Sequence, residues 1–212
     1  MTFSICVRER GEAGYRFGVA AAARVPAVGS VCPHVSDAGA VAVAGVTDAD
    51  AGRRLLDAIA GGDRVDDAIT ATDDPRTQRH GVGVDSTGAH TGADCRPVAA
   101  PRVGDGYTVA GTSLADEGVL DALAQGYREN ERDTPLVRRL ITALAAGERA
   151  GGDDRDLPVG SAAVAVRTGA SEPLYHDLRV DAAETPVADL RETYRRAKHG
   201  YDAAVDRYTE NS

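Results

Sequence analysis

The chain opens with MTFSICVRER (residues 1–10), and this stretch predicts that a β-strand begins almost at the first residue. The apolar run at 3–7 is followed by a polar turn, RERGEAG (8–14), and then by YRFGVAAAA (15–23). Two apolar runs around such a turn predict a β-hairpin. Most chains leave their first residues loose. Here Thr2 is instead expected to be held firmly at the head of a strand.

The rest of the chain alternates groups of strands with pairs of helices. Further strands are predicted at 40–46, 80–85, 107–110, 161–166 and 175–180. Helices are predicted from an N-cap at Thr47–Asp48 to residue 60, and at 65–71, 116–130, 136–149 and 187–208. Grouped strands with paired helices favour layered α+β architecture over a strictly alternating parallel sheet. The length of 212 residues favours a single domain over 1–212.

Charge and composition limit the classes of function. The net charge is −9, and Lys198 is the only lysine. A strongly acidic surface stays solvated at high ionic strength, so we expect a salt-adapted protein, with an ordinary acidic enzyme as the alternative. The same charge argues against a nucleic-acid partner, because nucleic-acid binding requires basic patches.

The sequence shows no pattern of a membrane or exported protein. No apolar run approaches the ~18 residues of a membrane span, and the start has no signal-peptide pattern. Three cysteines, Cys6, Cys32 and Cys95, are an odd and sparse set. We therefore expect reduced thiols, a cytoplasmic location and no membrane partner.

Thr2 is the first candidate for chemistry. A Met before a small residue is normally removed, which would leave Thr2 with both a hydroxyl nucleophile and a free α-amine. That amine has a pKa of about 7.7–8.0, suited to a general base near neutral pH. An amino-terminal threonine is one known way to activate a hydroxyl. The alternative is that Met-Thr is simply a common way for a chain to start.

Eight short motifs, in order along nearly the whole chain, resemble one family. They are TFSI (2–5), AVGSVCP (27–33), AGAVAVAG (38–45), AHTGADC (89–95), GDGY (104–107), AAGERAGGD (145–153), SAA (161–163) and DLRV (177–180). The chain is similar to domain-of-unknown-function family 1028, which is placed in the N-terminal nucleophile (Ntn) hydrolase superfamily with proteasome subunits. The resemblance implies a four-layer αββα sandwich, with two antiparallel sheets flanked by helices.

The resemblance also implies catalytic roles. Thr2 would be nucleophile and base, and the N–H of Gly45, at a strand end, would stabilise the oxyanion. Gly111 is a second candidate for that task, and turn geometry or close packing is the alternative for both glycines. Arg24 would replace the lysine that proteasome-like enzymes keep after the second strand, unless it forms only a surface ion pair.

Substrate-binding roles are implied for a second group of residues. His90 and Thr91 lie in a matching stretch, where His90 would orient substrate or be structural. Thr112 stands where the family has Asn. Asp153 and Arg155 resemble a GGD-x-R element, which would form the far wall of the site or only a loop salt bridge.

Several polar positions of the family are apolar or small here. Ala23, Val43–Ala44, Thr112 and Gly160 replace Ser, Thr-Gln, Asn and Gln, which leaves the substrate open. The hypothesis is an Ntn-type amidohydrolase that acts on an amide of a small molecule or peptide, without cofactor or metal, as a homo-oligomer. A catalytically inactive Ntn-fold binding or assembly module is the alternative. A Cys/His metal site is disfavoured, because the sequence has no C-x-x-C or H-E-x-x-H spacing.

Overall fold

The computed structural model describes residues 2–11, 14–46, 49–72, 74–95, 98–131, 133–169 and 172–210. It is an α+β structure with two antiparallel sheets. The strands are β1 (Thr2–Gly11), β2 (Gly14–Ala23), β3 (Pro33–Ser36), β4 (Gly39–Gly45), β5 (Thr77–Gly83), β6 (Thr87–Thr91), β7 (Ala100–Gly104), β8 (Tyr107–Thr112), β9 (Gly160–Arg167) and β10 (Asp177–Ala183). The helices are α1 (Ala51–Ala60), α2 (Val65–Thr70), α3 (Gly118–Arg128), α4 (Leu136–Arg149) and α5 (Pro186–Glu210), with two short 3-10 turns, η1 (Val28–Ser30) and η2 (Leu174–His176).

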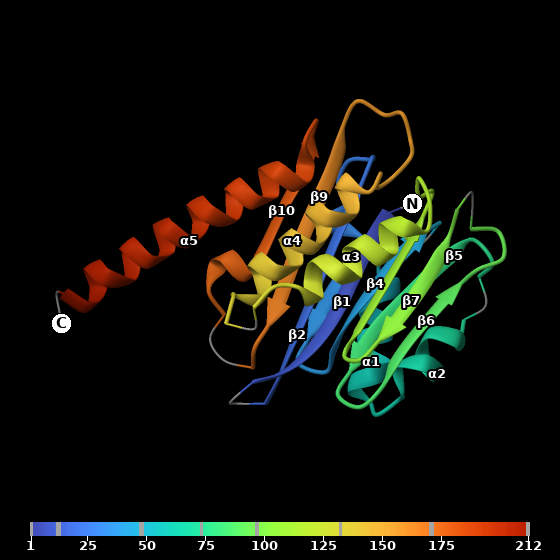
Figure 1. Ribbon diagram of the computed structural model, residues 1–212. Helices are drawn as coiled ribbons and strands as arrows, with labels where there is room; N and C mark the ends of the chain where they lie inside the picture. Colours follow the sequence, from blue (N-terminus) through green and yellow to red (C-terminus); the bar gives the residue numbers. More distant parts are fainter. Residues whose placement is uncertain are drawn as a thin grey trace.

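The elements form four layers (Figure 1). Sheet A has the strand order β10-β9-β2-β1-β8-β7, and sheet B has the order β3-β4-β5-β6. Helices α3, α4 and α5 cover the outer face of sheet A, whereas α1 and α2 cover the outer face of sheet B. The two sheets pack face to face in the middle. The expected sandwich of two antiparallel sheets flanked by helices is confirmed.

The β1–β2 hairpin forms as predicted, with Phe3 opposite Ala22. Successive side chains of a strand point to opposite faces of its sheet. Phe3 and Ile5 accordingly lie in the core beneath α3 and α4. Cys6, on the other face, belongs to a second core cluster between the sheets. That alternation also directs the side chain of Thr2 toward sheet B.

Three strands were not predicted: β3, β6 and β7. All three lie at the edge of a sheet, and β3 and β7 each contain a proline, Pro33 and Pro101. Proline cannot donate to a strand ladder and is confined to edges, so such segments carry a weak strand signal. The predicted N-cap at Thr47–Asp48 lies outside the described residues, and the first described residue of α1 is Ala51.

The long helix α5 packs only in its first half. Val187, Leu190 and Tyr194 are buried against the body. Residues 202–207 are exposed, and the helix runs away from the body toward the carboxyl end (Figure 1). Within the described part of the chain, no helix is both long and apolar enough to cross a membrane.

Candidate active site at the amino-terminal end of β1

Thr2 begins β1, a central strand of sheet A that lies between β2 and β8. Its cross-strand partner on β8 is Thr112. Both side chains point into the layer between the sheets, where Thr2 is 3% exposed and Thr112 is 1% exposed. The nucleophile candidate therefore lies within a central strand and is almost fully covered in this conformation.

The hydroxyl of Thr112 is buried and has no hydrogen-bond partner among the described residues. An unpaired buried polar group costs roughly 1–3 kcal/mol, so such groups are rare and often functional. The next residue, Ser113, has a positive φ of 56°, which is uncommon outside glycine. Backbone strain of this kind clusters at functional sites. An unsatisfied hydroxyl and a strained residue thus lie next to Thr2.

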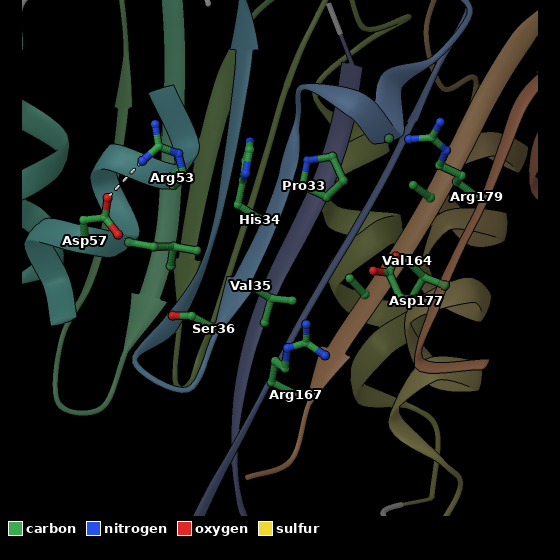
Figure 2. Close-up of a pocket in the computed structure, with 14 residues that line it drawn as sticks. Pro33, His34, Val35, Ser36, Arg53, Asp57, Val164, Arg167, Asp177 and Arg179 are labelled. Atoms are coloured by element: carbon green, nitrogen blue, oxygen red, sulfur yellow. Dashed lines mark ion pairs between the residues drawn. The ribbon is translucent and has the colours of Figure 1, made fainter. Parts of the chain in front are cut away.

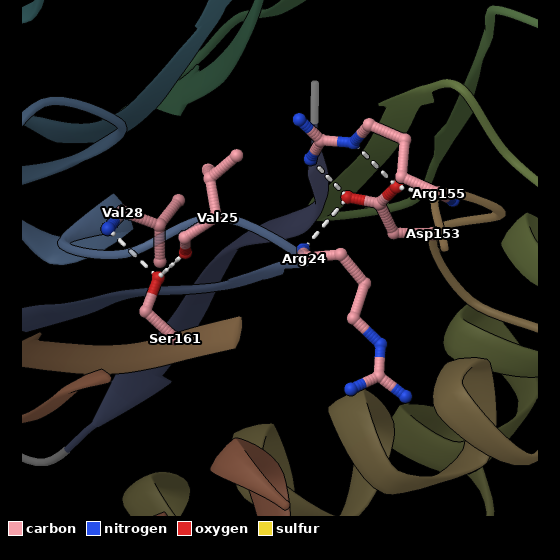
Figure 3. A network of polar contacts seen from close by, with 6 residues as sticks. All are labelled: Arg24, Val25, Val28, Asp153, Arg155 and Ser161. Atoms are coloured by element: carbon pink, nitrogen blue, oxygen red, sulfur yellow. Dashed lines mark hydrogen bonds and ion pairs between the residues drawn. The ribbon is translucent and has the colours of Figure 1, made fainter. Parts of the chain in front are cut away.

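A loop after α4 is tied to the same end of sheet A through Asp153 (Figure 3). Its buried carboxylate accepts hydrogen bonds from Arg24 N at 2.8 Å and from Arg155 Nε at 2.8 Å. Arg155 also forms an ion pair with Asp153 through Nη2. A bridge between Leu114 and Asp153 joins the loop to the end of β8. Asp153 and Arg155 are therefore brought together as a salt bridge at the end where Thr2 lies.

Arg24 meets this network through its backbone alone. Its guanidinium donates to the carbonyl oxygen of Glu184 at 3.1 Å and points away from Asp153, toward the helical layer (Figure 3). On that side, Arg24 and Glu148 line a small cavity of about 70 Å³. Burial raises the pKa of Glu148, and the nearby Arg24 charge opposes that shift. The charge of Arg24 is thus directed to the face of sheet A opposite the Thr2 side chain.

Gly45 ends β4 in the facing sheet, and its neighbours require a glycine. Its φ is 97°, and a Cβ atom there would lie 2.2 Å from the carbonyl oxygen of Arg76. Its partner across the ladder is Thr77. Close backbone approach and positive φ both exclude larger residues. Among the described residues, no hydrogen bond joins Gly45 to Thr2.

The sequence interpretation missed Gln78, which links the two sheets. This buried side chain donates to Thr91 Oγ1 at 2.8 Å and to the carbonyl oxygen of Gly111 at 3.0 Å. Gly111 itself packs too closely for a side chain, because a Cβ would lie 2.9 Å from the carbonyl oxygen of Thr2. Through these two hydrogen bonds, Gln78 holds Thr91 and Gly111 near the amino-terminal end of β1. The run of polar residues TQRH that opens β5 is the signal that could have indicated it.

His90 is separated from this group. On β6, His90 is the cross-strand partner of Arg79, so the two side chains lie on the same face of sheet B. The neighbouring Thr91 pairs with Gln78 and lies on the opposite face. Arg79 extends to the carbonyl oxygens of Ile69 and Thr72 at the end of α2. His90 therefore lies on the helical side of sheet B, not on the side that faces Thr2.

A second polar group lies deeper between the sheets. His80 is 1% exposed, with Nε2 at 2.7 Å from Ser4 Oγ and Nδ1 at 2.9 Å from Thr108 Oγ1. Burial lowers the pKa of His80 to about 3, so the ring is neutral at physiological pH. Ser4 lies two residues after Thr2 on the same face of β1. The hydrogen-bonded side chains of Ser4, His80 and Thr108 thus continue the polar residues of the candidate site into the layer between the sheets.

The cysteines are free thiols in the described structure. Burial raises the pKa of both Cys6 and Cys32, the latter to about 11. Such thiols are poor nucleophiles, because the thiolate is the reactive form. Within the described residues, no three His, Cys, Asp or Glu side chains converge in a way that could hold a metal ion.

Comparison with known proteins identifies the family. The model of a family of unknown function (DUF1028) matches residues 2–190. The chain belongs to this family. The crystal structure of the DUF1028 protein SPO2555 from Silicibacter pomeroyi is similar, with a TM-score of 0.80 and 26% sequence identity over 92% of this chain and 88% of that chain. A search among curated proteins found no match.

The structure brings Thr2, Thr112, Gly111, Thr91 and the Asp153 loop to one end of the sandwich. Gly45 lies at the same end, because Ala44, which precedes it on β4, is the cross-strand partner of Gln78. His90 and the guanidinium of Arg24 point elsewhere.

Proposed function

We propose that this DUF1028 protein is an Ntn-type amidohydrolase in which Thr2, once Met1 is removed, is both nucleophile and base. The observation that carries the proposal is the position of Thr2. It heads a central strand of a two-sheet sandwich, with its side chain between the sheets and beside the unpaired hydroxyl of Thr112. Such a rigid position suits a nucleophile whose geometry must be preorganised.

The proposed reaction acts on an amide of a small molecule or peptide. The Thr2 amine accepts the hydroxyl proton, the hydroxyl oxygen attacks the amide carbon, and an oxyanion forms. The Thr2 ammonium then returns its proton to the leaving nitrogen as the C–N bond breaks, which releases the amine product and leaves an ester on Thr2 that water hydrolyses. A well-placed N–H, from Gly45 or Gly111, would contribute about 3–4 kcal/mol of oxyanion stabilisation. The unpaired Thr112 hydroxyl is a hydrogen-bonding group available to the amine or the substrate.

The same features support a second candidate, an inactive Ntn-fold binding or assembly module. Thr2 is only 3% exposed, and Ala23 at the end of β2 and Ala44 near the end of β4 provide apolar side chains where polar ones would be needed to line a site. A substrate would have to enter a site that is closed in this conformation. A cytoplasmic location, which the free thiols favour, and a homo-oligomeric state are further parts of the proposal.

Mass spectrometry of the purified protein is the first test. We expect a mass that lacks Met1, because a blocked amine cannot act as base. Hydrolysis of a panel of amides should then disappear in Thr2→Ala and persist at reduced rate in Thr2→Ser, which keeps a hydroxyl. Retained Met1 in a preparation that hydrolyses amides, or full turnover by Thr2→Ala, would contradict the proposal. Removal of Met1 with no turnover of any amide would favour the inactive module.

A further inference from the structure

Sheet B is narrower than sheet A, and this difference opens a groove at one side of the sandwich. Sheet B ends at β3, which lies over β2 and β9, while sheet A continues to β10. A cavity of about 460 Å³ lies there, between β3 and α1 on one side and β9 and β10 on the other (Figure 2). Small-molecule sites have volumes of ~300–1,000 Å³.

The floor of the groove is formed by small residues on β9, and charged side chains rise around it. Arg167 lies two residues beyond Ala165 on β9, and Asp177 on β10 pairs with Ala165. Strand alternation therefore places Arg167 and Asp177 on the same face of sheet A. As diagonal cross-strand neighbours, they have Cα atoms ~7–8 Å apart. Both side chains lie at the groove (Figure 2).

Most charges along the groove are already paired. Arg53 pairs with Asp50 at 3.2 Å and with Asp57 at 3.6 Å. Arg179 pairs with Asp181 at 3.1 Å. These groups can rim the groove, but their charges are satisfied within the protein.

Arg167 and Asp177 differ from those groups. Neither the guanidinium of Arg167, which is half-buried, nor the carboxylate of Asp177 forms a hydrogen bond or ion pair with any described residue. The two opposite charges also do not pair with each other. A planar guanidinium presents parallel donors that match a carboxylate in two-point fashion. The groove therefore offers one unpaired site for an anion and one for a cation, on a floor of small residues.

We propose that this groove binds a small zwitterion, an amino acid or short peptide, with its carboxylate on Arg167 and its ammonium group on Asp177. The site is separate from Thr2. None of the candidate residues gathered around Thr2 lines the groove, whereas the η1 turn lines it through Gly29 and is held to β9 by a hydrogen bond from Val28 N to Ser161 Oγ at 2.9 Å. The inference is therefore independent of the proposed hydrolase activity.

Calorimetric titration of the full chain with three probes tests the inference. The probes are glycylglycine, which carries both charges, N-acetylglycine, which keeps only the carboxylate, and glycinamide, which keeps only the ammonium group. We expect glycylglycine to bind most tightly. Arg167→Gln should weaken glycylglycine and N-acetylglycine at least tenfold, and Arg167→Lys should weaken them less. Asp177→Asn should weaken glycylglycine and glycinamide but leave N-acetylglycine unchanged.

Arg128→Gln is the matched control, since Arg128 is an exposed arginine on α3 away from the groove. It should change none of the three affinities. Thermal unfolding of each variant shows whether it folds. If Arg167→Gln does not fold, the affinities of Asp177→Asn and Arg167→Lys for the three probes test the proposal in its place. The proposal is overturned if wild-type protein binds none of the probes, or if binding survives Arg167→Gln. It is also overturned if Asp177→Asn strengthens N-acetylglycine binding, which would indicate that Arg167 and Asp177 pair with each other in solution.

Discussion

At the scale of single residues, His80 couples the stability of the fold to pH. It is neutral and buried between the sheets, with both ring nitrogens in hydrogen bonds to Ser4 and Thr108. Its pKa is about 3 in the folded protein, against a usual value near 6.5. Between these values the unfolded chain binds more protons than the folded one. Stability is therefore full above about pH 6.5 and falls as the pH decreases through this window.

We predict that this single group makes the free energy of unfolding fall by ~1.4 kcal/mol per pH unit below pH 6.5. His80→Gln should lower the free energy of unfolding by roughly 1–3 kcal/mol at neutral pH, because the hydroxyl groups of Ser4 and Thr108 lose their hydrogen bonds to the ring. Its deficit relative to wild type should then shrink as the pH decreases. Urea unfolding at several pH values between 4.5 and 7.5 measures both effects.

His199→Gln is the control for this pH dependence, because His199 is exposed on α5. It should follow the wild-type curve at every pH. A constant difference between wild type and His80→Gln across the range would mean that His80 does not titrate with the lowered pKa.

At the scale of elements, one ionic cluster joins the β1–β2 hairpin to the helical layer. Glu9 on β1 forms ion pairs with Arg139 on α4 and, at 3.0 Å, with Arg16 on β2. It also accepts a hydrogen bond from the hydroxyl of Tyr127 on α3 at 2.7 Å. The guanidinium of Arg139 lies 4.5 Å from the centre of the Tyr127 ring. Burial, with the Glu9 charge, raises the pKa of Tyr127 well above its usual value.

We predict that Glu9→Gln lowers the free energy of unfolding by ~3–5 kcal/mol, because Arg139, 4% exposed, would lose its main counter-charge. The double variant Glu9→Gln, Arg139→Met should recover part of this loss, since no buried charge then remains unpaired. A double-mutant cycle in urea unfolding measures the coupling. Glu129→Gln, on the exposed end of α3, serves as control and should stay within ~0.5 kcal/mol of wild type. Equal effects of the two Glu variants would contradict the prediction.

At the scale of the whole molecule, the charge distribution sets the response to salt. The net charge is −9. Many of the ion pairs are exposed, such as those of Glu192 with Arg195 and Arg196 on α5. Exposed pairs contribute little, whereas self-repulsion of the excess acidic charge acts over the whole surface.

We predict that the melting temperature rises between about 0.1 M and about 2 M KCl, because the screening length shortens from ~10 Å to a few Å. Near pH 5.0, the calculated isoelectric point, the rise should be much smaller since little net charge remains to be screened. Scanning calorimetry at both pH values gives the comparison. A melting temperature that stays constant or falls with salt at pH 7.5 would refute salt adaptation of this kind.

The local pattern was enough to predict most elements. The β1–β2 hairpin, β4, α2 and α4 follow from runs of apolar residues and from the turns that bound them. Family resemblance added the sandwich arrangement, which the structure confirms. The edge strands β3, β6 and β7 escaped prediction, because the prolines of β3 and β7 and the mixed polarity of all three carry no periodic signal.

The sequence by itself determined that Thr2 heads a strand and that the fold is a layered α+β structure with grouped strands and paired helices. Only the tertiary structure decided which candidates lie together. One residue of register separates Thr91, which faces sheet A, from His90, which faces away. The unpaired Thr112 hydroxyl, the buried His80 and the groove beside β3 also depend on it. The physical reason is that strand order and register are set by packing between distant segments, and neither is encoded in any short stretch of the chain.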